Sequence, residues 1–298
     1  MKAYPNYRHS GVEWMESLPE QWITKSLKYL GRIDNSGVWG ADEYAQGLFE
    51  LPVPTTAQLT IQGVWKETEM SVRWVTESEK SYYICRTGDI IVVKASGSAT
   101  NIITGKSGYI SEEENGKFGF GNFLLRVRPV KLEPKLLYYF LSCQLTKQRI
   151  ELMVSSTTYP NLKVEEYINA QIPIPQPNEQ TEIISFLDEK TKQIDTLIEK
   201  KQKMIELLKE ERQAVINEAV TKGINPKAKM KDSEIEWLGE IPEHWELKKF
   251  KYLGKIRNGY AFGSNEFTNE GIRVLKISNI QTLNIDWSDE SFLPKEYY

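Results

Sequence analysis

Short apolar runs separated by Gly-rich loops make up most of residues 23–132, and this pattern predicts strands joined by turns. A turn at Thr87-Gly88-Asp89 precedes the continuous apolar run 90–93, which predicts a strand buried on both faces. Residues 118–129 predict another strand, and Pro134 opens a helix predicted over 134–153. The elements expected after it are a loop at 155–162, a helical turn at 163–168 and an extended segment at 170–175. The mixture predicts an α/β (α+β) domain.

The pattern changes at residue 179, after which neither Pro nor Gly occurs for 44 residues and charges alternate in sign. Asn178 is the expected N-cap of a helix over 179–222, and Gly223 and Pro226 are expected to end it. Eight of eleven positions spaced alternately by three and four residues are apolar, which predicts a coiled-coil seam on a helix of roughly 65 Å. The side chains expected to pair with another long helix are Ile184, Leu187, Ile194, Ile198, Ile205, Leu208 and Val215. A polar helix surrounded by solvent is the alternative.

A segment of 22 residues near the start of the chain occurs a second time at an offset of 223. Residues 10–31 and 233–254 are identical at eleven positions. The identical positions include Trp14/Trp237, Pro19/Pro242 and Trp22/Trp245. We therefore predict that both segments fold alike, with Trp237 and Trp245 buried as Trp14 and Trp22 are. So long a period indicates a duplicated domain rather than a solenoid, whose repeats are about 20–50 residues long.

The length of 298 residues suggests about two domains, which agrees with the duplication. The predicted parts are a first domain at 1–178, the long helix at 179–222, a linker at 223–231 and the start of a second domain at 232–298.

Composition narrows the class of protein further. No apolar run approaches the ~18 residues that a membrane helix needs, and the first residues contain no secretory signal. Cys85 and Cys143 lie in apolar neighbourhoods and are expected to be buried thiols in a reducing compartment. His9 and His244 have no Cys or His at ligand spacing, so no zinc motif is present. We expect a cytoplasmic protein that does not contact a membrane.

Several short motifs follow one another along the chain. They are Gly88-Asp89-Ile90 before the buried strand, Thr158-Tyr159-Pro160-Asn161-Leu162, Ile172-Pro173-Ile174-Pro175 running into Glu179-Gln180, Phe186-Leu187-Asp188-Glu189-Lys190, and Glu218-Ala219-Val220-Thr221-Lys222-Gly223. Together with the repeated segment and the long helix, they resemble the specificity (S) subunit of Type I restriction–modification enzymes, over nearly the whole chain.

The resemblance implies two target-recognition domains, separated by two antiparallel helices, that each read one half of a split DNA site. It also implies that S-adenosylmethionine, ATP and Mg serve the partner modification and restriction subunits, with no cofactor in this chain. The sequence departs from the family pattern near its end. The second repeat has no counterpart of Gly88-Asp89-Ile90 or of a second long helix, so we expect the second recognition domain to be truncated.

Motifs for catalysis are absent from the sequence. An adenine methyltransferase would need an Asn/Asp-Pro-Pro-aromatic motif to hold the flipped base. Thr104-Gly105-Lys106-Ser107 has the tail of a phosphate-binding loop, but position 100 is Thr where that loop needs Gly. Asp89 and Lys94 lack the second carboxylate of a nuclease motif, and we interpret them as turn and strand-end residues. We expect a non-catalytic chain.

DNA binding has firmer physical support, although residues 1–178 contain 19 basic and 19 acidic side chains. Affinity must then come from windows without acidic residues, and 90–111 and 152–164 are two such windows. Their hydroxyl and amide side chains, interspersed with lysines, suit contacts with phosphates and base edges. The candidate DNA-binding residues are Lys94, Ser96, Ser98, Thr100, Asn101, Lys106, Thr157, Thr158, Tyr159 and Lys163. The alternative is that these segments are ordinary turns.

The leading interpretation is a subunit that reads double-stranded DNA and tethers modification (methyltransferase) and restriction subunits. A different class is an assembly scaffold, or a non-reading competitor for the modification subunits. An autonomous nuclease is disfavoured by the missing motifs. The uncovered helix also predicts an antiparallel homodimer of the isolated chain, which would read a symmetric split site. Modification subunits could cover the helix instead.

Overall fold

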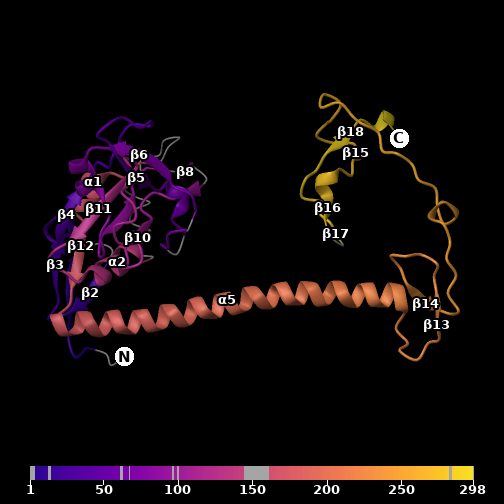
Figure 1. Cartoon of the computed structure of the whole chain (residues 1–298), viewed down its shortest axis with the longest axis horizontal. Coiled ribbons are helices and arrows are strands. Elements are labelled where there is room, and N and C mark those ends of the chain that lie inside the picture. The colour runs from indigo at the N-terminus through magenta and orange to yellow at the C-terminus, as the bar shows by residue number, and fades with distance from the viewer. Residues whose placement is uncertain are drawn as a thin grey trace. The chain divides into compact units, whose positions relative to one another are not determined.

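The structure is a computed structural model that describes residues 4–12, 15–60, 63–66, 68–95, 97–98, 101–143, 161–281 and 284–297, with the backbone alone at 97, 98, 101, 102 and 297. The chain divides into two compact units, Met1–Lys201 and Gln202–Tyr298, and many of their helices and strands are labelled in Figure 1.

The centre of the first unit is a four-stranded antiparallel sheet. Its strands, in spatial order, are β10 (Ser107–Tyr109), β7 (Ile90–Val93), β11 (Leu124–Pro129) and β4 (Gly31–Asp34). Every residue of β7 is buried, which confirms the prediction for the apolar run 90–93. Strand β11 begins only at Leu124, because Gly121–Leu124 forms a turn, so the predicted strand over 118–129 is wrong in its first half.

Both faces of this sheet are covered by apolar side chains. Ile90 and Val92 face a cluster that includes Leu137 and Leu141 of α2 (Pro134–Ser142). Ile91 and Val93 face a second cluster, with Trp65, Phe118 and Phe120. Alternate residues of a strand point to opposite faces, so one short run of branched residues contributes to both clusters.

The first unit contains further short strands and helices besides this sheet and α2. They are β1 (Tyr7–Val12) paired with β2 (Met15–Pro19), β3 (Ile23–Ser26) paired with β12 (Gln171–Ile174), β5 (Phe49–Val53) paired with β6 (Ser71–Val75), β8 (Gly97–Ser98) paired with β9 (Asn101–Ile102), η1 (Leu27–Tyr29), η2 (Thr56–Gln58), α1 (Glu77–Tyr83) and α4 (Val164–Ile168). Helix α4 and strand β12 confirm the helical turn and the extended segment predicted before the long helix.

Helix α2 is shorter than predicted. Pro134 is its first residue, as expected, but the helix ends at Ser142 because Cys143 adopts an extended conformation (φ −70°, ψ 156°). The prediction of one helix over 134–153 is therefore wrong at Cys143. Cys85 is fully buried, and this burial raises the pKa of its thiol; Cys143 is only half-buried, contrary to the prediction for both.

The long helix α5 runs over Pro177–Lys222. The prediction of Asn178 as the N-cap is wrong, because Pro177, whose fixed φ suits the first helical position, already lies inside the helix. Gly223 follows the helix with φ +76°, a left-handed conformation that favours glycine, which confirms its predicted role as the stop.

The first turns of α5 belong to the first unit. The indole Nε1 of Trp22 donates to Glu179 Oε2 at 3.1 Å, and Lys135 Nζ lies 2.8 Å from Asp188 Oδ2. The hydroxyl of Tyr139 donates to Asp188 Oδ1 at 2.5 Å, and burial together with this bond raises the pKa of Tyr139 to about 12. Three polar contacts thus fix the beginning of the helix to the first unit.

Part of the apolar stripe of α5 remains exposed. Ile184 packs against the core of the first unit and Leu187 is half-buried near α2, whereas the sequence analysis expected both to pack against another long helix. The remaining five, Ile194, Ile198, Ile205, Leu208 and Val215, are 47–60% exposed. Exposed Leu197, Met204 and Leu207 widen the stripe beyond the predicted seam.

The second unit repeats the beginning of the first. Strand β13 (Met230–Asp232) pairs with β14 (Glu240–Pro242), and Met230 opposite Pro242 matches Tyr7 opposite Pro19 at the offset of 223. The later elements are η3 (Phe250–Tyr252), which matches η1 at the same offset, β15 (Ile272–Arg273) paired with β18 (Phe292–Leu293), η4 (Ile277–Asn279), β16 (Ile280–Gln281) paired with β17 (Asn284–Ile285), and η5 (Lys295–Tyr297). The repeat seen in the sequence is therefore a structural repeat.

Burial differs between the two copies. Trp245 is half-buried like Trp22, but Trp237 is 83% exposed, so the prediction of its burial is wrong; Trp14 lies outside the described residues. Phe250 and Leu253 are 69% and 66% exposed, whereas Leu27 and Leu30 at the matching positions are fully buried. Leu27 and Leu30 belong to a large apolar cluster, and the described part of the second unit contains no such cluster.

Candidate nucleic-acid interface

The two windows without acidic residues meet in the first unit, although they are far apart in sequence. The backbone N–H of Leu162 donates to the carbonyl oxygen of Lys94 at 2.8 Å, and Ala95 forms an antiparallel bridge with Asn161. The end of β7 therefore lies beside the start of the segment that leads to α4.

A groove with a volume of about 670 Å³ opens at this junction. Its lining combines aromatic, hydroxyl, amide and guanidinium groups with apolar residues. The lining residues are Val38, Trp39, Val53, Pro54, Thr55, Thr56, Ser71, Arg73, Ala95, Gly121, Asn122, Phe123, Leu124 and Asn161. No carboxylate occurs among these described lining residues, so the groove wall itself offers no negative side chain to repel phosphate or base-edge acceptors.

One wall of the groove is the turn at Gly121–Leu124. The N–H of Leu124 donates to the carbonyl oxygen of Gly121 at 3.0 Å, and the carbonyl oxygen of Phe123 accepts from the N–H groups of Lys94 at 2.8 Å and Ala95 at 3.3 Å. The backbone of the turn is thus tied to β7, yet the ring of Phe123 is 63% exposed.

The neighbouring wall is the loop 35–39, which packs closely on this turn. The N–H of Val38 donates to the carbonyl oxygen of Phe120 at 2.9 Å. At Gly37 an added Cβ would lie 2.2 Å from the carbonyl oxygen of Gly121, so only glycine permits this approach. The loop ends in Trp39, whose ring is 71% exposed.

Lys94 lies beside the groove rather than in its described lining. Its Nζ donates to the carbonyl oxygen of Asn35 at 2.7 Å, and burial lowers the pKa of its ammonium group. An ammonium group has three donors, so Lys94 can hold the loop 35–39 and still contact a phosphate.

The other predicted DNA-binding residues fall in three groups. Lys106 Nζ donates to the carbonyl oxygen of Leu59, and Lys163 forms an ion pair with Glu166 at 3.2 Å; neither is a described lining residue. Ser98 and Asn101 lie in the β8–β9 hairpin, where only the backbone is described. Ser96, Thr100, Thr157, Thr158 and Tyr159 lie outside the described residues. The predicted set as a whole stays a prediction.

Sequence reasoning missed several residues of the groove. Trp39, Arg73, Asn122 and Phe123 come from segments outside the two acid-free windows. No local pattern distinguished Phe123 in the sequence from Phe118 and Phe120, which the structure shows to be buried.

Comparison with known proteins places this geometry in a family. Residues 19–207 match the family described as Type I restriction modification DNA specificity domain, and this match spans more than half of the chain. The chain belongs to that family. The specificity domain so defined contains every residue that lines the groove.

Two curated relatives agree with this assignment. The specificity subunit of the Type I restriction enzyme MjaVIII from Methanocaldococcus jannaschii is 32% identical over 219 residues, which are 72% of this chain and 46% of that protein. The specificity subunit of the Type I restriction enzyme EcoKI from Escherichia coli is 26% identical over 284 residues, which are 93% of this chain and 57% of that protein. The chain spans about half the length of these relatives.

A solved structure supports the fold. A chain from a structure of the type I restriction–modification system superposes with a TM-score of 0.51 at 20% identity, covering 73% of this chain and 49% of that chain. The α+β architecture with its long helix is therefore the fold of this family.

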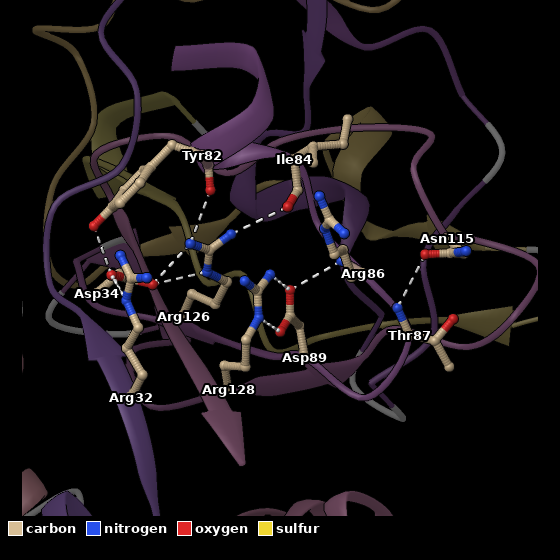
Figure 2. Close-up of polar contacts among 10 residues, drawn as sticks. All are labelled: Arg32, Asp34, Tyr82, Ile84, Arg86, Thr87, Asp89, Asn115, Arg126 and Arg128. Carbon is tan, nitrogen blue, oxygen red and sulfur yellow. Dashed lines mark hydrogen bonds and ion pairs between the residues drawn. The ribbon is translucent and has the colours of Figure 1, made fainter. Parts of the chain in front are cut away.

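Figure 2 shows a network of ion pairs and hydrogen bonds within the specificity domain. Fully buried Arg126 donates through Nε and Nη2 to Asp34 Oδ2 at 2.9 and 2.8 Å, and it also donates to the carbonyl oxygens of Ile84 and Tyr82. Asp34 accepts further bonds from Arg32 at 3.0 Å and from the Tyr82 hydroxyl at 2.8 Å. Burial by itself would raise the pKa of Asp34, but the bonds from Arg126 and Tyr82 outweigh it and lower this pKa.

The network connects the two segments that carry the exposed aromatic rings. Asp34 immediately precedes the loop that ends in Trp39, and Arg126 lies three residues after Phe123. Since Arg126 and Asp34 lie opposite each other in the β11–β4 pair, their ion pair stabilises the register on which the groove depends.

A second ion pair involves Asp89, the central residue of Gly88-Asp89-Ile90. Arg128 donates to both carboxylate oxygens at 2.7 Å, and the N–H of Arg86 donates to Oδ2 at 2.9 Å (Figure 2). The carboxylate is buried and fully engaged, which confirms the interpretation of Asp89 as a turn residue.

Neither a metal-binding cluster nor a membrane-spanning helix occurs among the described residues. They contain no group of three or more His, Cys, Asp or Glu side chains that could hold a metal ion. None of the helices within the described ranges is both long and apolar enough to cross a membrane.

Proposed function

We propose that this chain is a DNA sequence-specificity subunit that reads one half of a split target in a Type I restriction–modification enzyme. The groove without carboxylates, where the two acid-free windows meet within a specificity domain, is the observation that carries the proposal. Its hydroxyl, amide, guanidinium and aromatic side chains are those that contact phosphates, base edges and base methyl groups.

In this proposal the chain binds and orients, and its partners carry out the chemistry. The modification subunits use S-adenosylmethionine for methyl transfer to adenine, and the restriction subunit uses ATP and Mg for translocation and cleavage. The chain contributes no catalytic side chain, and it works in the cytoplasm. The buried carboxylates Asp34 and Asp89 support this division of labour, because arginines already occupy them.

A binding selection tests the reading function. The purified chain is incubated with a library of duplexes that carry a randomised segment, and bound DNA is sequenced at two salt concentrations. We expect an enriched motif, because a reader discriminates between base sequences while phosphate contacts do not. Trp39→Ala should weaken the motif, whereas Trp237→Ala, which removes an exposed tryptophan of the second unit, should leave it unchanged. Binding without any enriched motif would contradict the reading function.

The exposed stripe of α5 supports a role in assembly. We propose that it pairs with the same helix of a second copy, antiparallel about a two-fold axis, when no modification subunit covers it. Full burial of an aliphatic side chain is worth roughly 1.5–3 kcal/mol. The five seam residues that are about half exposed would therefore gain on the order of 4–8 kcal/mol, before the costs of association.

The same stripe favours the second candidate function, an assembly scaffold or a competitor that binds modification subunits without reading DNA. The two functions differ in one observable. A reader and a scaffold both bind modification subunits, but only the reader makes the DNA affinity of the complex depend on base sequence.

A further inference from the structure

The turn at Gly121–Leu124 carries an amide and an aromatic ring on adjacent residues, and backbone hydrogen bonds hold it against the end of β7. Asn122 and Phe123 are its two central residues, and the carbonyl of Phe123 is held by two N–H groups of the β7 end. Burying a phenylalanine is worth roughly 1.5–3 kcal/mol, yet this ring stays exposed at the groove while Phe118 and Phe120 are buried. The fold therefore forgoes this stabilisation to keep an apolar ring at the surface.

The amide of Asn122 is oriented by its neighbour. The hydroxyl of Ser36 donates to Asn122 Oδ1 at 3.2 Å. An amide oxygen has two lone pairs, so Oδ1 can accept a second bond, and no acceptor for the Nδ2 donors occurs among the described residues. Asn122 thus offers one acceptor and one donor side by side at the groove.

This pairing matches one base pair better than the others. An asparagine amide forms two bonds with adenine, accepting from N6 and donating to N7, and an aromatic ring makes apolar contact with the thymine methyl group. Guanine is instead read by arginine or lysine. Arg73, the arginine among the described lining residues, forms an ion pair with exposed Asp42.

We propose that Asn122 and Phe123 determine specificity for an A·T base pair in the DNA half-site, with Asn122 binding the adenine edge and Phe123 contacting the thymine methyl group of the same or the neighbouring pair. The inference rests on the proposed reading function and names the residues and the base pair through which it operates.

Replacing the amide tests the first half of this proposal. The duplex selection is repeated with Asn122→Ala and with Asn122→Asp. Asn122→Ala should reduce discrimination at one A·T position by about 5- to 150-fold and leave the rest of the motif intact. Asn122→Asp should shift the preference at that position from adenine toward cytosine, whose N4 group donates to a carboxylate. This gain of a new preference cannot result from misfolding.

Removing the methyl group tests the second half. In the duplex selected by the unmodified chain, each thymine is replaced in turn by deoxyuridine, which lacks only the C5 methyl. One such replacement should weaken binding by about fourfold, the value of one apolar carbon, and Phe123→Ala should abolish this difference. Tyr29→Ala, which removes a similarly exposed ring elsewhere on the first unit, is the matched control and should keep the difference.

The outcomes separate this inference from the proposed function. If the unmodified chain selects a motif, but both Asn122 variants keep it unchanged and deoxyuridine has no effect, the chain reads DNA through other residues and the inference is wrong. If the unmodified chain selects no motif, the reading function fails and the inference fails with it.

Discussion

Loss of the Asp34 carboxylate should destabilise the central sheet more than loss of any exposed acidic residue. In Asp34→Asn the guanidinium of Arg126 stays fully buried without its counter-ion, because its other partners are the neutral carbonyls of Ile84 and Tyr82. Breaking a buried ion pair in this way costs about 3–5 kcal/mol of unfolding free energy. The matched control is Asp42→Asn, since the exposed Asp42–Arg73 pair contributes only about 0–1 kcal/mol.

The effect of Asp34→Asn on the free energy of unfolding should depend on pH, because the pKa of Asp34 is lowered in the folded protein. A carboxylate whose pKa is lower in the folded than in the unfolded state stabilises the fold fully when the pH is above its unfolded pKa, which is about 3.9 for Asp. This stabilisation is lost as the pH falls through the lower pKa of the folded state. The free energies of unfolding of the unmodified chain and of Asp34→Asn should therefore differ most near neutral pH and converge in acid, as the pH falls through the lowered folded pKa of Asp34.

Hydrogen exchange at increasing urea concentrations measures the free energy of unfolding of the central sheet itself. Peptides covering β7 and β11 report the opening of the central sheet independently of α5 and of the second unit. The double variant Asp34→Asn/Arg126→Met should lose less free energy of unfolding than the two single variants together, by about 1–3 kcal/mol. The reason is that removing both charged groups leaves neither of them buried without a partner. Equal effects of Asp34→Asn and Asp42→Asn, within about 0.5 kcal/mol, would refute the reasoning.

Three further predictions concern DNA binding by the first unit and the pairing of helix α5. Lys94→Ala and Lys106→Ala should each weaken binding to all duplexes and lower the slope of log affinity against log salt by up to about one phosphate contact, measured by titration at several salt concentrations. The double variant Ile198→Glu/Ile205→Glu should be monomeric or insoluble, whereas the unmodified chain should be a dimer. If light scattering shows the unmodified chain to be a soluble monomer at tens of micromolar, the pairing of α5 with a second copy is contradicted. Gly37→Ala should weaken the selected DNA motif while β7 stays protected from hydrogen exchange, because its added Cβ displaces the loop from the turn and leaves the core in place.

Elements that depend on neighbouring residues could be predicted from the sequence. The buried strand β7 follows from a run of four branched residues, and helix α5 from the absence of Pro and Gly over 44 residues. The structural repeat follows from identities at a constant offset of 223, because like local sequences favour like local backbone structure. The same local reasoning placed the end of α2 wrongly, since the extended backbone at Cys143 is not marked by Pro or Gly.

The groove depended on contacts that no local pattern encodes. Its walls come from separate segments, and they meet because β11 pairs with both β7 and β4 in one particular register. That register brings Asp34 against Arg126, which lies 92 positions further along the chain. The sequence by itself determined the family resemblance, the repeat and the long helix, because these rest on local patterns. Only the tertiary structure decided which side chains face the groove, because strand pairing over long separations sets which residues become neighbours.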